Sequence, residues 1–224
     1  MADPGTAQEE AREPHVAAIA AALVLFYEAL TPEVLGRLAD GLKNLIPSLW
    51  SKRLTDAIVE PLVEAGRDLG ERVAAEISED PVFDPDILNA YLEQIAEDYG
   101  TRHVADMREQ VNEAARVIEA EMAEEVDAEV ARILAEAQEN ATKVAAEQVN
   151  KVANFAGLDA AKAEGMTTKT WHTGTNPRAT HAAQDGMTIG IDERFPNGQR
   201  FPGSPGPPEE TAGCNCDMTF GRDD

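Results

Sequence analysis

The sequence is poor in aromatic residues, and this shortage limits the kind of core that the chain can build. Aromatic residues make up only 5% of the 224 residues, which is low for a large compact core. Alanine and glutamate dominate the composition instead, and such a composition favours long helices over a large globular domain. We therefore expect a mostly α-helical protein.

Positive charge is also scarce. The chain has 19 lysines and arginines against 42 aspartates and glutamates, which gives a formal net charge of −23 at pH 7. A surface of this charge repels phosphate, so the bulk of the protein is a poor candidate for wrapping nucleic acid. A basic patch confined to one part of the chain remains open as an alternative.

A hydrophobic run long enough to cross a membrane is missing. The longest apolar run, Val16–Tyr27, is shorter than the roughly 20 residues that a membrane-spanning helix requires. Glu9, Glu10 and Glu13 precede it, where a signal peptide would carry basic residues. The sequence therefore predicts a soluble, unsecreted protein without membrane contact.

The N-terminal part of the chain predicts a tail followed by helices. Residues 1–14 are polar and contain two prolines, so we expect a mobile tail there. Residues 15–80 predict a helical region, whose first helix ends near Leu30 and either packs in a bundle or binds a partner. Thr31 and Pro32 predict the start of a second helix, which Pro47 ends. Pro61 is expected to kink or split the helix after that, whose apolar stripe includes Leu54, Ile58, Leu62 and Ala65.

Residues 84–160 predict a long helical rod. Asp84 can cap a helix that Pro85 opens, and apolar residues then recur every three or four positions, as on one face of a helix. A single helix cannot bury so narrow an apolar stripe by itself, so we expect it to pack against other helices, from this chain or from another protein. The rod is either continuous or folded into two antiparallel helices at Tyr99–Gly100. The members of the stripe are Val104, Met107, Val111, Ala115, Ile118, Met122, Val126, Val130, Ile133, Ala137, Ala141 and Val144.

The rod is strongly acidic in its middle part. Between Glu113 and Glu139 the only basic residues are Arg116 and Arg132. This pattern is typical of a solvated helix face, and a face that meets a basic partner is the alternative. The acidic residues are Glu113, Glu119, Glu121, Glu124, Glu125, Asp127, Glu129, Glu136 and Glu139.

Residues 166–220 differ in composition and predict a small α+β module. The segments MTTKTWHT, MTIGID and CDMTF are expected to be strands. PRATHAAQ is expected to be a short helix that Asn176 caps and Pro177 opens. Asp185 and Gly186 predict a tight turn, and Pro196-Asn197-Gly198 predicts a hairpin between 194–195 and 200–201.

Within this module, three residues have the chemistry of metal ligands. His181 lies on the expected helix, and Cys214 and Cys216 alternate at the start of the last strand. Imidazole and thiolate are the ligands that zinc prefers, and Asp185, His172 or water could be the fourth. The alternative is a buried histidine beside two buried thiols. A disulfide between the two cysteines would close a small, strained ring, so we do not expect one.

Two other functions are compatible with residues of the module. Cys214, His181 and Asp185 have the residue types of a nucleophile, a base and its orienting group. No activating sequence context surrounds the cysteine, however, and the module is small, so we do not expect an enzyme. The module also holds the bases of the only candidate phosphate site, which are Lys169, Arg178, Arg194 and Arg200.

The order of residues in this module resembles a known family. The resemblance is to the phage Mu F-type minor head proteins, also called phage head morphogenesis proteins, and it covers about residues 166–220. The family pattern differs here in having Asn215 between the cysteines and Ser204 after Gly203. The matching residues are Lys169, Trp171, Asn176, Pro177, Arg178, His181, Asp185, Gly186, Phe195, Asn197, Gly198, Pro202, Gly203, Pro205, Cys214 and Cys216.

The resemblance implies a structural part of a virion. Members of the family associate with the portal protein inside the phage head, where they act in head assembly and in the fate of the packaged genome. It thus implies assembly in the bacterial host cytoplasm, with the portal as partner and the major capsid or scaffold protein as further candidates. A DNA-binding, ejected protein that guides the genome end is the alternative, against which the acidic charge argues.

Overall fold

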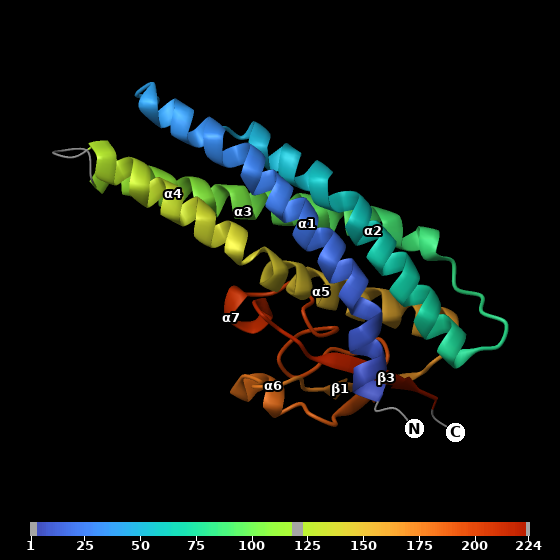
Figure 1. Ribbon diagram of the computed structural model, residues 1–224. Helices are drawn as coiled ribbons and strands as arrows, with labels where there is room; N and C mark the ends of the chain where they lie inside the picture. The colour runs from blue at the N-terminus through green and yellow to red at the C-terminus, as the bar shows by residue number, and fades with distance from the viewer. Residues whose placement is uncertain (1–3, 118–122, 223–224) are drawn as a thin grey trace.

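The computed structural model describes residues 4–117 and 123–222 and shows a mostly α-helical fold with a small antiparallel sheet near the C-terminus (Figure 1). This confirms the expected fold class. The main helices are α1 (Pro4–Ala39), α2 (Leu49–Ile77), α3 (Asn89–Val117), α4 (Ala123–Glu139) and α5 (Ala141–Ala163), with the 3-10 turn η1 (Pro85–Leu88) before α3. The remaining elements are β1 (Thr168–His172), α6 (Ala179–Ala182), β2 (Thr188–Gly190), α7 (Pro208–Thr211) and β3 (Asp217–Gly221).

Helix α1 is longer at both ends than the sequence predicts. Residues 4–14, expected as a mobile tail, are helical, and the Arg12 guanidinium donates to Asn150 Oδ1 of α5 at 2.8 Å. The helix also continues through Thr31 and Pro32. Thr31 does not cap a new helix, because its hydroxyl donates to the Tyr27 carbonyl one turn earlier, at 2.9 Å. The expected second helix is therefore the last part of α1, which ends at Ala39 rather than near Pro47.

Helix α2 also contains a proline without ending there. Pro61 lies in its interior, so the expected split does not occur. The apolar stripe predicted for this segment faces the core, with Leu54, Ile58, Leu62 and Ala65 fully buried. The packing of this continuous stripe outweighs the one backbone hydrogen bond that proline removes. The 3-10 turn η1 follows α2 along the chain. The cap that the sequence predicts there is confirmed, because the Asp84 side chain accepts from the Asp86 N–H.

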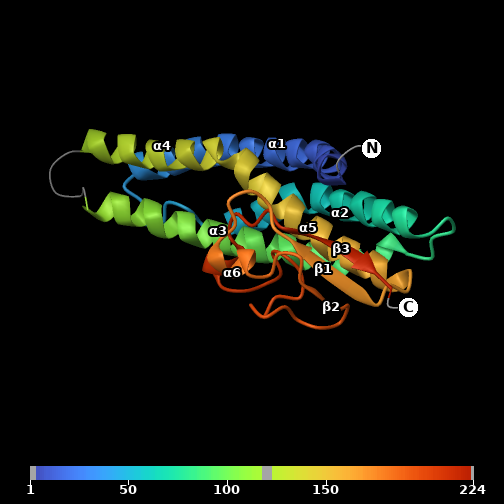
Figure 2. The same ribbon diagram turned by 90° about the horizontal axis from the view of Figure 1, so that it is seen from below.

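The rod is not one continuous helix. Helices α3 and α4 lie side by side and antiparallel (Figures 1 and 2), and α3 runs through Tyr99 and Gly100 without the predicted break. The stripe residues Ile118 and Met122, and the acidic residues Glu119 and Glu121, lie outside the described residues. Helices α4 and α5 follow each other, separated only by Asn140.

The main helices form an elongated antiparallel bundle with one apolar core. Helix α1 packs against α2, α4 and α5, and α2 packs against α3 and α5. In α4 the side chains of Glu125, Asp127, Glu136 and Glu139 are exposed, and Arg132 pairs with Glu129 and Glu136. Within the described ranges, one stretch, Glu10–Ala39, is long and apolar enough to cross a membrane by length and composition. This stretch is longer than the apolar run Val16–Tyr27 noted in the sequence, because α1 continues through Pro32.

The C-terminal module packs against the second half of α5. Its sheet has the order β2-β1-β3, and both pairs of strands are antiparallel. The three strands lie where the sequence predicts them. Residues 194–201 form a tight turn instead of the predicted hairpin, with the Gly198 N–H donating to the Phe195 carbonyl at 2.8 Å. The core of the module contains Leu158, Ala161, Trp171, Ile191, Phe195, Phe201, Cys214, Cys216 and Met218.

Candidate metal centre

The short helix α6 places His181 in the interior of the module. The side chain is only 1% exposed, and its ring lies edge-on to the Trp171 ring, with the centroids 5.2 Å apart. Helix α6 starts differently from the prediction. Asn176 has a left-handed backbone with φ of 51°, and the residue at the N-cap position is Arg178. The backbone at Asn176 therefore turns the chain into the helix, whereas its side chain caps nothing in α6.

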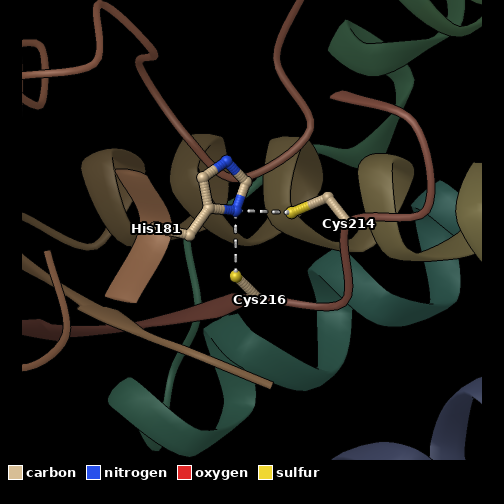
Figure 3. A group of neighbouring side chains, drawn as sticks. All are labelled: His181, Cys214 and Cys216. Atoms are coloured by element: carbon tan, nitrogen blue, oxygen red, sulfur yellow. Dashed lines mark hydrogen bonds between the residues drawn. The ribbon is translucent and has the colours of Figure 1, made fainter. Parts of the chain in front are cut away.

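The two cysteines approach His181 from the loop before β3. His181 Nδ1 lies 3.4 Å from Cys216 Sγ and 3.7 Å from Cys214 Sγ (Figure 3). Both cysteines are free and buried. The three candidate ligand atoms all lie within 4.8 Å of one another, so this buried group could hold a metal ion. The prediction that these three residues converge is confirmed.

The nitrogen–sulfur distances of the group are compatible with a shared metal ion. With zinc–nitrogen and zinc–sulfur bonds of usual length, the nitrogen and each sulfur should lie roughly 3.6 Å apart. The two observed distances, 3.4 and 3.7 Å, lie on either side of that value. A shared metal ion would satisfy all three atoms.

One of the two thiols is already inclined to ionise. The hydrogen bond from Cys214 lowers the pKa of Cys216, and a further hydrogen bond from the Gly174 backbone acts in the same direction. The pKa of Cys214 is raised, because it is the donor to Cys216 and because it is buried. Thiolate is the form that binds metal, so Cys216 is the cysteine prepared for the first bond.

Two asparagines of α5 hold the cysteine loop by hydrogen bonds to its backbone. Asn150 Nδ2 donates to the carbonyl oxygens of Cys214 and Cys216 at 2.9 and 3.1 Å. Asn154 Nδ2 donates to the Cys216 carbonyl at 2.9 Å. Both asparagines are buried. The sequence gives no signal for them, because they look like ordinary polar residues of a helix.

Arg178 and Glu210 complete the surroundings of His181. The Arg178 guanidinium donates to the backbone carbonyls of Glu210 and Ala212. Glu210 Oε2 lies 3.3 Å from His181 Nε2, on the side of the ring opposite the sulfurs. Sequence reasoning missed Glu210, because no local motif marks the short helix α7 as part of a site.

Asp185 and His172, the other candidate ligands, do not join the group. Asp185 is exposed and accepts a hydrogen bond from the Thr173 N–H at 2.8 Å. This bond lowers the pKa of the Asp185 carboxyl and closes the turn after α6. His172 Nε2 contacts Thr219 Oγ1 across the sheet at 2.8 Å. The prediction of Asp185 as a fourth ligand is therefore wrong.

The candidate phosphate contacts do not form one basic patch. Lys169 is fully buried, and its ammonium donates to the carbonyls of Ile191, Glu193 and Arg200 at 2.9, 2.7 and 2.8 Å. Burial lowers the pKa of Lys169 to about 8. The side chain of Arg194 donates to the Gly198 carbonyl at 2.8 Å. Arg178 is bound to two carbonyls, so the exposed side chains among the four are Arg194 and Arg200.

The other residues of the resemblance shape the module. Trp171 packs edge-on against Phe195, with ring centroids 4.9 Å apart, and the Asn197 side chain accepts from the Gln199 N–H at 3.1 Å. Gly186 and Gly198 have φ of 71° and 83°, values that favour glycine.

Comparisons of the chain with protein-family models, curated proteins and solved structures found no match.

Proposed function

We propose that this chain is a minor capsid protein of a tailed bacteriophage, which docks on the portal vertex inside the head and supports assembly, packaging or ejection. The observation that carries the proposal is the module built from the ordered residues that resemble the Mu F-type minor head proteins. Lys169, Trp171, Arg178 and His181 all make internal contacts there.

The proposal includes a structural zinc ion held by His181, Cys214 and Cys216. The donor set, the burial and the nitrogen–sulfur distances support it. A module with so small a core gains stability from such a cross-link. When bound, the zinc would tie α6 to the start of β3 and fix the cysteine loop on α5.

The helical bundle supports a role in attachment. It is elongated (Figure 2), and the outer surface of α4 carries Glu125, Asp127, Glu136 and Glu139 as exposed side chains. Such a surface suits either solvent or a basic partner. We take it as the candidate docking surface for the portal and call it the α4 acidic face.

Zinc binding is tested by elemental analysis of the purified protein. We expect one zinc per chain, and we expect Cys214→Ser and Cys216→Ser each to lose it. A matched control is Ser204→Ala, which alters a buried polar residue of the same module without touching the group. Wild-type protein that holds no zinc after purification in zinc-supplemented medium would refute this part of the proposal.

Portal binding is tested by co-expression with the portal protein of the same phage. We expect the two proteins to co-elute in size-exclusion chromatography and the chain to be present in purified virions. Reversal of the α4 acidic face, with Glu125→Lys and Glu136→Lys combined, should weaken co-elution. A variant reversed at Glu93 and Glu97, exposed residues of α3, should not. Absence of the chain from virions would refute the proposal.

The alternative function, binding of the genome end, is tested alongside. Since Lys169 is buried and Arg178 and Arg194 bind carbonyls, we expect no salt-dependent shift in fluorescence anisotropy when labelled DNA is titrated with the protein. A complex that weakens steeply with salt would favour the alternative over portal docking.

A further inference from the structure

We infer that Glu210 positions His181 for metal binding, by holding the imidazole proton on Nε2 and so leaving the Nδ1 lone pair directed at the cysteine sulfurs. This inference rests on the proposed metal site and adds a residue to it. The carboxylate would contact the ligand and not the metal. Glu210 is thus a positioning residue, and its removal should change metal affinity without removing a ligand.

The positions of the two ring nitrogens carry the inference. Nδ1 faces both sulfurs, at 3.4 and 3.7 Å. Nε2 faces Glu210 Oε2 at 3.3 Å, and in the described part of the chain it is buried with no aligned hydrogen-bond partner. A small tilt of the carboxylate or the ring would align that contact. No other acidic group is recorded near this nitrogen among the described residues.

Glu210 is held in place by several contacts. The Thr180 hydroxyl donates to Glu210 Oε2 at 3.1 Å, and Thr180 directly precedes His181 in the sequence. The Glu210 backbone carbonyl accepts from Arg178 Nη1 at 3.0 Å and from Gln199 Nε2 at 3.2 Å. The Glu210 side chain is 20% exposed. Hydrogen bonds from Arg178, Thr180 and Gln199 therefore hold Glu210 beside the His181 ring.

The physical reason is the tautomer of the ring. A neutral imidazole carries one proton, and the nitrogen without it is the one that can bind a metal. A carboxylate attracts the proton to the nitrogen that it faces. Metal-bound histidines usually donate their second N–H to a carboxylate or carbonyl, and removal of such a partner typically lowers metal affinity about 10–100-fold.

The experiment compares Glu210→Gln with Glu147→Gln in the full-length protein. Glu147 also holds the cysteine loop, since its Oε2 accepts from the Gly213 N–H at 2.9 Å, but it does not contact His181. Zinc affinity is measured by competition with a chromogenic chelator. We expect Glu210→Gln to weaken zinc binding about 10–100-fold, Glu210→Asp to weaken it less, and Glu147→Gln to leave it within about threefold.

A spectroscopic readout separates positioning from a merely structural role. Nitrogen-15 NMR of the His181 ring should show a protonated Nε2 and a metal-bound Nδ1 in the wild type. In Glu210→Gln, the metal-free protein should show a mixture of both tautomers. If Glu210→Gln does not fold, Thr180→Val is measured instead, because it removes the hydroxyl that holds the carboxylate and should give a smaller loss of affinity.

The outcomes distinguish this inference from the proposed function. Equal zinc affinity of Glu210→Gln and Glu147→Gln, with zinc lost in Cys216→Ser, would overturn the role of Glu210 and leave the metal site standing. A wild type that binds no zinc would overturn both.

Discussion

Asn150 of α5 holds the backbone of Cys214, with its side-chain amide 2.9 Å from the Cys214 carbonyl oxygen. The same amide reaches the Cys216 carbonyl, and its own oxygen accepts from Arg12 near the start of α1. One buried side chain therefore connects the first helix, the fifth helix and the metal loop. The candidate site and the bundle are a single structural unit at this point.

Asn150→Ala should destabilise the protein by about 1–3 kcal/mol, because the Cys214 carbonyl loses its donor in a buried place, whereas the Cys216 carbonyl keeps the hydrogen bond from Asn154. The measurement is urea unfolding followed by circular dichroism. Asn140→Ala is the control, since the Asn140 amide donates to the exposed Glu136 carbonyl of the preceding helix α4. Equal midpoints for the two variants would show that the contact to the cysteine loop contributes nothing.

Lys169→Met should destabilise the module by about 3 kcal/mol, because three carbonyls that share one ammonium lose their partner. Lys162→Met is the matched control. Lys162 pairs with the exposed Asp192, and such surface ion pairs contribute at most about 1 kcal/mol. Urea unfolding of the two variants compares them, and a loss for Lys169→Met no larger than that of the control would contradict the structural role.

Gly100→Ala should destabilise the bundle by about 1–3 kcal/mol, because the added methyl group overpacks the contact of α3 with α2. A Cβ at this position would clash with the Thr55 hydroxyl and lie 2.9 Å from the Ser51 carbonyl. Gly36→Ala meets open space in α1 and should stabilise the protein by about 0.5–1 kcal/mol. Thermal unfolding decides the question, and a gain in both variants would be inconsistent with close packing at Gly100.

The protein should unfold in alkali as its tyrosines ionise. Burial raises the pKa of all three, to about 12 for Tyr91 and further for Tyr27 and Tyr99. Their ordinary pKa is about 10, so below that pH the hydroxyls are neutral in both states and stability is unaffected. Above it the unfolded state loses protons first, and the free energy of unfolding falls.

This dependence is measured by tyrosinate absorbance together with circular dichroism. We expect both signals to change at the same pH, well above the ordinary tyrosine pKa. Absorbance that rises near pH 10 while the helical signal stays constant would mean that the hydroxyls are accessible in the folded protein.

Local patterns in the sequence were enough for several parts of the structure. The apolar stripe of α2, the cap at Asp84 and the three strands all follow from spacing and turn residues. His181, Cys214 and Cys216 were expected to converge because imidazole and thiolate are the ligands that zinc prefers. Each of these predictions depends on which face of a short segment is apolar or on where the chain must turn.

Prolines misled the prediction of helix boundaries. Pro32 and Pro61 are local signals for a break, yet α1 and α2 continue through them, since tertiary packing of a long apolar face stabilises each helix by more than one missing hydrogen bond costs. The predicted break of the rod at Tyr99–Gly100 shows the same weakness of local sequence signals. Gly100 looked like a breakpoint, but the glycine is needed where α3 crosses closely over α2.

The sequence by itself determined that the chain is mostly helical, that its last part is a small α+β module, and that a histidine and two cysteines meet there. Only the tertiary structure decided that Lys169 is an internal anchor, that Asp185 closes a turn, and that Asn150 and Glu210 serve the candidate site. The physical reason is the short range of hydrogen bonds. Which distant carbonyl or ring nitrogen comes within about 3 Å of a polar group depends on how the elements pack, and no local pattern records it.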